Sequence, residues 1–163
     1  MNFTCNDYNA AAEFTCGSGH INPVKAIDPG LVYEASKEDY IKLLCLVLNQ
    51  TSVRLISGDN STCSTGSDKG SLHGHNYPSL AAAVTPKKPF SFKFHRKVKN
   101  VGLANSTYKA KIFAGNSTDE ADIKVVPEVL SFKCLNEEKT FDVTVVGKGL
   151  SEEVQSDVSA SLV

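Results

Sequence analysis

The sequence predicts a mainly β protein, a β-sandwich of about seven short strands preceded by a small region of helix and loop. The spacing of the apolar residues carries this prediction. Before residue 57 they recur at helical spacing, and after residue 76 they alternate with polar residues. Between the two patterns, residues 57–75 are rich in Gly, Ser, Asp and Thr, so we expect a linker there.

The helical part is expected to begin late. Residues 1–19 are polar and without a clear period, and residues 20–30 carry Asn-Pro and Pro-Gly turn signals. Ser36 and Asp39 then have the form of a capping box, which predicts the start of a helix. A second, shorter helix over residues 51–56 rests on weaker spacing. The apolar residues of the first helix must be buried against another element: Tyr40, Leu43, Leu44, Val47 and Leu48.

Beyond the linker, the sequence alternates as half-buried strands do. Phe90, Phe92 and Phe94 face one way, and the charged residues between them face the other. We place a domain boundary at the linker, which gives domains of residues 1–72 and 73–163. The other runs that read as strands are Tyr77–Val84, Tyr108–Ile112, Ile123–Val125, Val129–Phe132, Phe141–Val145 and Val154–Leu162.

The bulk composition favours neither nucleic acid nor a membrane as partner. The formal net charge is −1, so no long-range field would attract polyanions. A membrane-spanning helix needs about 18 apolar residues, and the longest apolar cluster, Ile41–Leu48, is short and interrupted by Lys42. A Gly-rich phosphate loop is absent from the sequence, and we expect no cofactor.

Secretory marks are present without a secretory leader. Five N-x-T sequons in turn-rich stretches favour passage through the secretory pathway, and the five cysteines fit an oxidising compartment. The N-terminus has neither the basic start nor the apolar core of a signal peptide. We therefore expect a piece of a longer, secreted protein. The candidate glycosylation sites are Asn2, Asn49, Asn60, Asn105 and Asn116.

The cysteines suggest one favoured disulfide. Cys45 ends the predicted helix and Cys63 lies in the linker, and a bridge between them would tie the linker to the helix. Closing such a loop is worth roughly 3 kcal/mol in the chain-entropy view. Cys5 with Cys16 is a second, less favoured pair. Cys134 is expected to be a free, small apolar residue.

Candidate chemical motifs favour structural explanations. Ser18 lies in a G-S-G-H stretch, but a nucleophile elbow needs G-x-S-x-G between a strand and a helix. His73 and His75, with Cys63 nearby, lack the paired spacings of a zinc site and are expected to be exposed linker residues. His95 is expected on the outward face of a strand. We predict no catalytic, metal-binding or cofactor-binding residue in this chain.

A basic run follows the linker: Lys87, Lys88, Lys93, Arg96, Lys97 and Lys99. A solvated strand face and a polyanion contact both fit it. The solvated face is favoured, because the run lacks aromatic residues interleaved on the same face.

Several segments, in order, resemble the C-terminal region of plant-type subtilisin-like serine proteases, the cucumisin-like subtilases. They include EFTCGSGHINPVKAIDPGLVYE, KEDYIKLLC, LISGDNSTC, NYPSLA, HRKVKNVG, STYKAKIFA, IKVVPEVLSF, TFDVTV and VSASLV. The resemblance implies that residues up to about 72 are the remnant of an α/β peptidase domain. From about residue 76 it implies a fibronectin type III-like domain, truncated because the family continues beyond Val163 with a closing strand.

The same resemblance bears on chemistry. A bridge between Cys45 and Cys63 coincides with one that the family pattern suggests. The Ser-His-Asp triad of the family, with its G-T-S-M serine motif, has no match in this chain, and Ser18 and His20 do not match triad positions. Cys16 stands where the family commonly has an aromatic residue, and Glu34 stands where it commonly has Asp.

The resulting expectation is a non-catalytic C-terminal fragment of a secreted subtilisin-like serine endopeptidase, inactive alone and located outside the cell or in the cell wall. Its β-domain would stabilise the catalytic domain, which is its expected intramolecular partner, and protein or peptide substrates would be reached only through the parent. The alternative is a self-standing secreted β-sandwich binding module without enzymatic activity.

Overall fold

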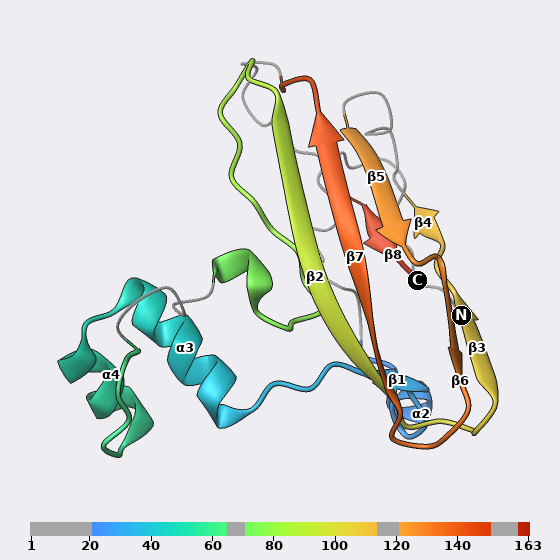
Figure 1. Cartoon of the computed structure of the whole chain (residues 1–163), viewed down its shortest axis with the longest axis horizontal. Helices are drawn as coiled ribbons and strands as arrows, with labels where there is room; N and C mark the ends of the chain where they lie inside the picture. Colours follow the sequence, from blue (N-terminus) through green and yellow to red (C-terminus); the bar gives the residue numbers. More distant parts are fainter. Residues whose placement is uncertain (1–20, 65–70, 114–120, 151–159) are drawn as a thin grey trace.

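The computed structural model describes residues 21–64, 71–113, 121–150 and 160–163 of the chain (Figure 1). Its helical elements come first, and its long strands follow. The order of elements is α2 (Pro23–Ala26), β1 (Leu31–Val32), α3 (Lys37–Val47), α4 (Gln50–Ser57), the 3₁₀ turn η2 (Leu72–Gly74), β2 (Phe90–Asn100), β3 (Ser106–Lys109), β4 (Ile112–Phe113), β5 (Ala121–Val126), β6 (Val129–Phe132), β7 (Glu138–Gly147) and β8 (Ser161–Leu162).

Both predicted helices are confirmed, and their caps explain where they begin. Ser36 accepts from the Asp39 N–H while the Asp39 carboxylate accepts from the Ser36 N–H, so the capping box of α3 is complete. Helix α4 is capped at its start by Asn49, whose side chain accepts from the Ser52 N–H, and at its end by Gly58 in the left-handed conformation. The helices extend to one side of the sandwich (Figure 1).

The strands of the predicted sandwich all pair antiparallel in the described residues. One sheet has the order β1-β2-β7-β5, and two short pairs, β3-β6 and β4-β8, accompany it. The register of β2 and β7 places Phe94 opposite Val143 and Phe92 opposite Val145. The core lies between the layers and is formed by Phe94, Val98, Val125, Leu130, Phe132, Phe141 and Val143.

Within the described residues, two strand predictions need correction; the predicted run Val154–Leu162 lies outside them apart from its end, where β8 forms. Tyr77–Val84 forms no strand, although Leu80 and Ala82 within it pack against the core. The carbonyls of Tyr77 and Ser79 accept hydrogen bonds from the Arg96 side chain, which satisfies them without a neighbouring strand.

The run predicted over Tyr108–Ile112 is two strands, β3 and β4. The backbone changes partner between them, because the Ala110 N–H donates to the Glu128 carbonyl while Lys111 exchanges both bonds with Val163. Alternation of side chains continues through such a change of partner, so the period alone could not reveal it.

Candidate functional site at the junction of helices and sandwich

The segment that leads into α3 is bonded to the sandwich as an edge strand. Leu31 pairs with Asn100 and Val32 with Lys99. The Gly30 carbonyl accepts from the N–H groups of Val101 and Gly102 at 2.9 and 3.1 Å. We call residues 30–34 the strap. The strap precedes the linker in sequence, yet its hydrogen bonds belong to the large sheet of the sandwich.

The strap requires glycine at its first residue. Gly30 has a φ of +75°, a conformation that L side chains rarely adopt, and a Cβ there would lie 2.9 Å from the Tyr108 hydroxyl. Tyr108 belongs to β3 and stacks edge-on against Phe132 of the core. The strap is therefore fitted closely against the end of the sandwich.

The side chain of Asn76 ties the strap to β2. Its Nδ2 donates to the carbonyls of Glu34 and Lys97 at 2.8 and 2.9 Å, and its Oδ1 accepts from the Lys97 N–H at 2.8 Å. Glu34 also forms an ion pair with Lys99 at 2.9 Å. Three segments therefore meet at Asn76: the strap, the residues that directly follow the linker, and β2.

Arg96 holds the chain that follows the linker, and its placement corrects the prediction of a solvated basic face. Only 3% of Arg96 is exposed. Its guanidinium donates to the carbonyls of Tyr77, His73 and His95 at 2.8 to 2.9 Å, and it lies over the Phe94 ring at 5.6 Å. Burial lowers the pKa of Arg96, and the electrostatic interaction with Tyr33 partly offsets this decrease. Bonding to several carbonyls at once suits a planar group with five donors.

Three lysines of the basic run form ion pairs with acidic side chains: Lys93, Lys97 and, as described above, Lys99. Lys93 lies 3.0 Å from Asp142, and Lys97 lies 2.9 Å from Glu138. Hydrogen bonds from His95 and then Lys93 lower the pKa of Asp142. Such exposed pairs are worth about 0–1 kcal/mol each, and they balance the charge of the lysines that form them.

His95 is exposed, as predicted, and its Nδ1 lies 2.8 Å from Asp142. A histidine and an aspartate in contact are two of the three groups of a hydrolytic triad. Among the described residues, no hydroxyl or thiol completes it by a hydrogen bond to His95. The pair is part of the surface charge network.

The two linker histidines are not simply exposed, and this prediction was wrong. The His73 ring packs edge-on against Phe92 and Phe94, at 5.4 Å from each, and His75 packs edge-on against Tyr40 of α3 at 5.1 Å. They line a cavity of about 300 Å³ between α3 and the sandwich. His75 Nε2 is buried in this junction and finds no hydrogen-bond partner within the described ranges.

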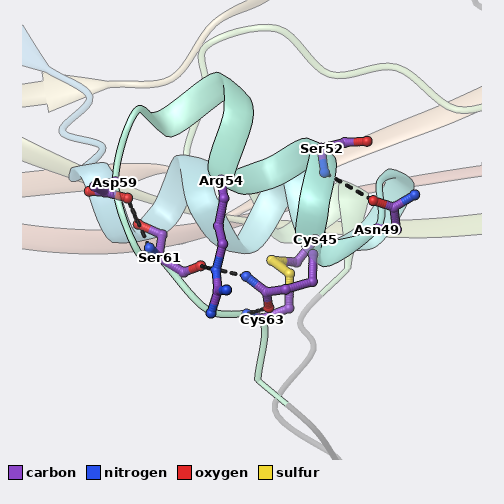
Figure 2. Close-up of a disulfide and its surroundings, with 8 residues drawn as sticks. Cys45, Asn49, Ser52, Arg54, Asp59, Ser61 and Cys63 are labelled. Carbon is purple, nitrogen blue, oxygen red and sulfur yellow. Dashed lines mark hydrogen bonds between the residues drawn. A yellow bond between two sulfur atoms is a disulfide. The ribbon is translucent and has the colours of Figure 1, made fainter.

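Figure 2 shows the disulfide that closes the helical segment. Cys45 and Cys63 are bonded, with their Cα atoms 5.5 Å apart and a sequence separation of 18. The returning chain also packs on α4, because Gln50 Oε1 accepts from the Cys63 N–H at 2.7 Å and Arg54 donates to the Ser61 carbonyl at 3.3 Å. Cys63 is therefore no metal ligand beside His73 and His75.

Other sequence-predicted residues are placed as follows. Cys134 is free, as predicted, and its side chain is exposed in the turn after β6. Asn49, Asn60 and Asn105 are all exposed. The remaining candidates lie outside the described residues: Asn2, Cys5, Cys16, Ser18, His20 and Asn116.

Neither a metal centre nor a membrane-spanning helix is found within the described ranges. No group of three or more His, Cys, Asp or Glu side chains there could hold a metal ion. The helices within the same ranges are all too short or too polar to cross a membrane.

Taken together, the fold and the junction define an antiparallel β-sandwich module whose edge is bonded to a helical segment from outside the module. A model of the Fibronectin type-III domain family matches residues 74–163. The chain therefore belongs to this family, which confirms the predicted fold.

The whole chain is also homologous to plant subtilisin-like proteases, which confirms the resemblance seen in its motifs. It is 47% identical over 165 aligned residues to Subtilisin-like protease SBT4.6 of Arabidopsis thaliana, a match that covers 100% of this chain and 22% of the relative. It is 46% identical to Subtilisin-like protease SBT4.4 of the same plant, covering 94% of this chain and 20% of the relative. The chain thus spans about a fifth of the length of these relatives.

Proposed function

We propose that this chain is the non-catalytic part of a secreted subtilisin-like serine endopeptidase, and that its sandwich stabilises the catalytic domain. The observation that carries the proposal is the strap. Residues 30–34 precede the domain match at residue 74, yet they form the edge of its sheet. Separating the helical segment from the sandwich would therefore break the hydrogen bonds of the strap.

The helical segment also has apolar surface for a further domain to cover. Leu55 and Ile56 of α4 are 84% and 60% exposed, and Val24 of α2 is 78% exposed. Large apolar side chains exposed on α4, and separately on α2, are typical of surfaces that another part of a protein buries (Figure 1). The proposed occupant is the rest of the peptidase domain, in a protein that works outside the cell or in the cell wall.

A chimera tests the proposal. This chain replaces the matching stretch of SBT4.6, and the half-life of peptidase activity is measured at rising temperature. We expect an active chimera whose half-life falls when Asn76→Ala loosens the junction. Lys93→Ala, which alters only the exposed charge network, is the control. Equal half-lives for the chimera and for the same protein without residues 74–163 would contradict the proposal.

A self-standing binding module is the alternative. It would unfold cooperatively as a soluble monomer and would show no serine-dependent hydrolysis. The proposed non-catalytic role also expects no hydrolysis from these 163 residues, so the discriminating result is the chimera rather than the isolated chain.

A further inference from the structure

Two turns meet at one end of the sandwich, shown at the lower end of Figure 1. One turn joins β2 to β3 and the other joins β6 to β7. Asn100 is fully buried between them, and its Nδ2 donates to the carbonyls of Leu103 and Cys134 at 3.0 and 3.3 Å. The Asn105 N–H donates to the Lys133 carbonyl at 3.4 Å. The turns therefore form one surface.

This surface exposes apolar side chains around an asparagine. Leu103 is 80% exposed in the first turn, and Leu135 is 56% exposed in the second. Asn105 is exposed and has a φ of 57°, a left-handed conformation that asparagine tolerates. Its side-chain amide has no hydrogen-bond partner in the described part of the chain.

Asn105 is also the first residue of the sequon Asn105-Ser106-Thr107, and Thr107 is exposed at the start of β3. A free amide on a fixed turn, with its threonine in reach of solvent, is a suitable acceptor for an N-linked sugar. The leucines explain what the sugar would do there, because exposed apolar groups favour a covering partner.

We propose that Asn105 carries an N-linked oligosaccharide whose first sugars cover Leu103 and Leu135. This inference rests on the proposed passage through the secretory pathway. The donor is an oligosaccharide joined through a diphosphate to a lipid. Asn105 Nδ2 forms a bond to the anomeric carbon as the bond from that carbon to the diphosphate oxygen breaks. The amide proton goes to a base, and the lipid diphosphate leaves with the electron pair.

Asn105 is favoured over Asn49 by its unengaged amide, and over Asn60 by its place on the sandwich, away from the helical segment. Asn49 uses its Oδ1 to cap α4, and both Asn49 and Asn60 belong to the helical segment that the catalytic domain is proposed to contact. Asn60 adjoins Asp59 and Ser61, which are bonded to each other in the loop held by the disulfide.

The test expresses the full chain in a glycosylating host behind an added signal peptide, so that it does not depend on the natural address of the protein. Peptide mass spectrometry should find sugar on Asn105, removable by peptide N-glycosidase. Asn105→Asp and Thr107→Ala should lose it, and Thr107→Ser should keep it because the sequon survives. Protein retained inside the cell is analysed in the same way. An unmodified Asn105 beside a modified Asn49 or Asn60 would overturn the site.

A second measurement tests the covering of the turns. The exposed thiol of Cys134 lies in the same surface, so its reaction with a bulky maleimide should be several-fold slower before enzymatic removal of the sugar than after it. Equal rates would overturn the covering. Failure of either measurement leaves the chimera result unaffected, so this inference and the proposed function fail separately.

Discussion

The Asn76 side chain pairs with the backbone of Lys97 as a neighbouring β-strand residue would. Its Nδ2 donates to the Lys97 carbonyl at 2.9 Å and its Oδ1 accepts from the Lys97 N–H at 2.8 Å. A carboxamide has the same donor and acceptor as a peptide group, so Asn76 occupies a ladder position next to the short strand β1. The edge of β2 is thereby closed by a side chain.

Asn76→Ala should destabilise the chain by about 1–3 kcal/mol, because it removes three hydrogen bonds at once and each contributes about 0.5–1.5 kcal/mol net. Asn76→Asp should do the same, since a carboxylate cannot donate to the two carbonyls. Urea unfolding measures the change. The matched control is Lys97→Ala, which keeps the backbone bonds and removes only an exposed ion pair. Equal losses for the control and the Asn76 variants would contradict this role.

Gly30→Ala should destabilise the chain for two separable reasons. The left-handed backbone costs a non-glycine residue about 1–2 kcal/mol, and the new Cβ would meet the Tyr108 hydroxyl at 2.9 Å. Tyr108→Phe removes the hydroxyl and its long hydrogen bond to Asn100. A double-mutant cycle in urea should therefore show that Gly30→Ala costs less in the Tyr108→Phe background than in the wild type. An unchanged cost would mean that the hydroxyl contact contributes nothing.

The junction shows what the sequence could and could not predict. The capping box of α3 and the strands β2 and β7 follow from local pattern, and the structure confirms them. Arg96 and Asn100 lie in phase with Phe94 and Val98, so the period of two already placed them on the inner face. Their polarity, however, favoured a surface position. The carbonyls that satisfy them inside the protein lie mostly in other segments, so the sequence of β2 could not show that these partners exist.

The strap could not be predicted in the same way. Strand β1 has two residues, too few to show a period, and its partner lies far along the chain. The bond from Asn76 to Glu34 spans 42 residues, and nothing in either local sequence indicates the other. Contacts of this kind are determined by tertiary packing.

His75→Phe should leave stability unchanged or raise it by about 1 kcal/mol. The histidine Nε2 is buried without a partner among the described residues, and an unsatisfied buried polar group costs free energy that an apolar ring of similar shape avoids. Phenylalanine can keep the edge-on contact with Tyr40. His75→Ala is the control and should destabilise by losing that contact. A loss of stability in His75→Phe as large as in His75→Ala would indicate that the nitrogen has a bonding role.

Acid should weaken the turn between β6 and β7 through Glu137. The pKa of this carboxylate lies below its usual 4.5, chiefly because it accepts a hydrogen bond from the Lys133 backbone N–H and secondly because it accepts one from the Lys139 side chain. A group whose pKa is lowered on folding stabilises the protein above its unfolded pKa, and the contribution is lost as the pH falls through the folded pKa. The free energy of unfolding should therefore decline once the pH drops below about 4.5.

Glu137→Gln should be less stable than the wild type at neutral pH, and the difference should shrink on acidification. Lys139→Ala should keep most of the pH dependence, because the backbone bonds to Glu137 remain. Urea titrations at neutral and acidic pH measure both variants, and a gap between Glu137→Gln and wild type that stays constant with pH would show that the carboxylate charge is not what the turn uses.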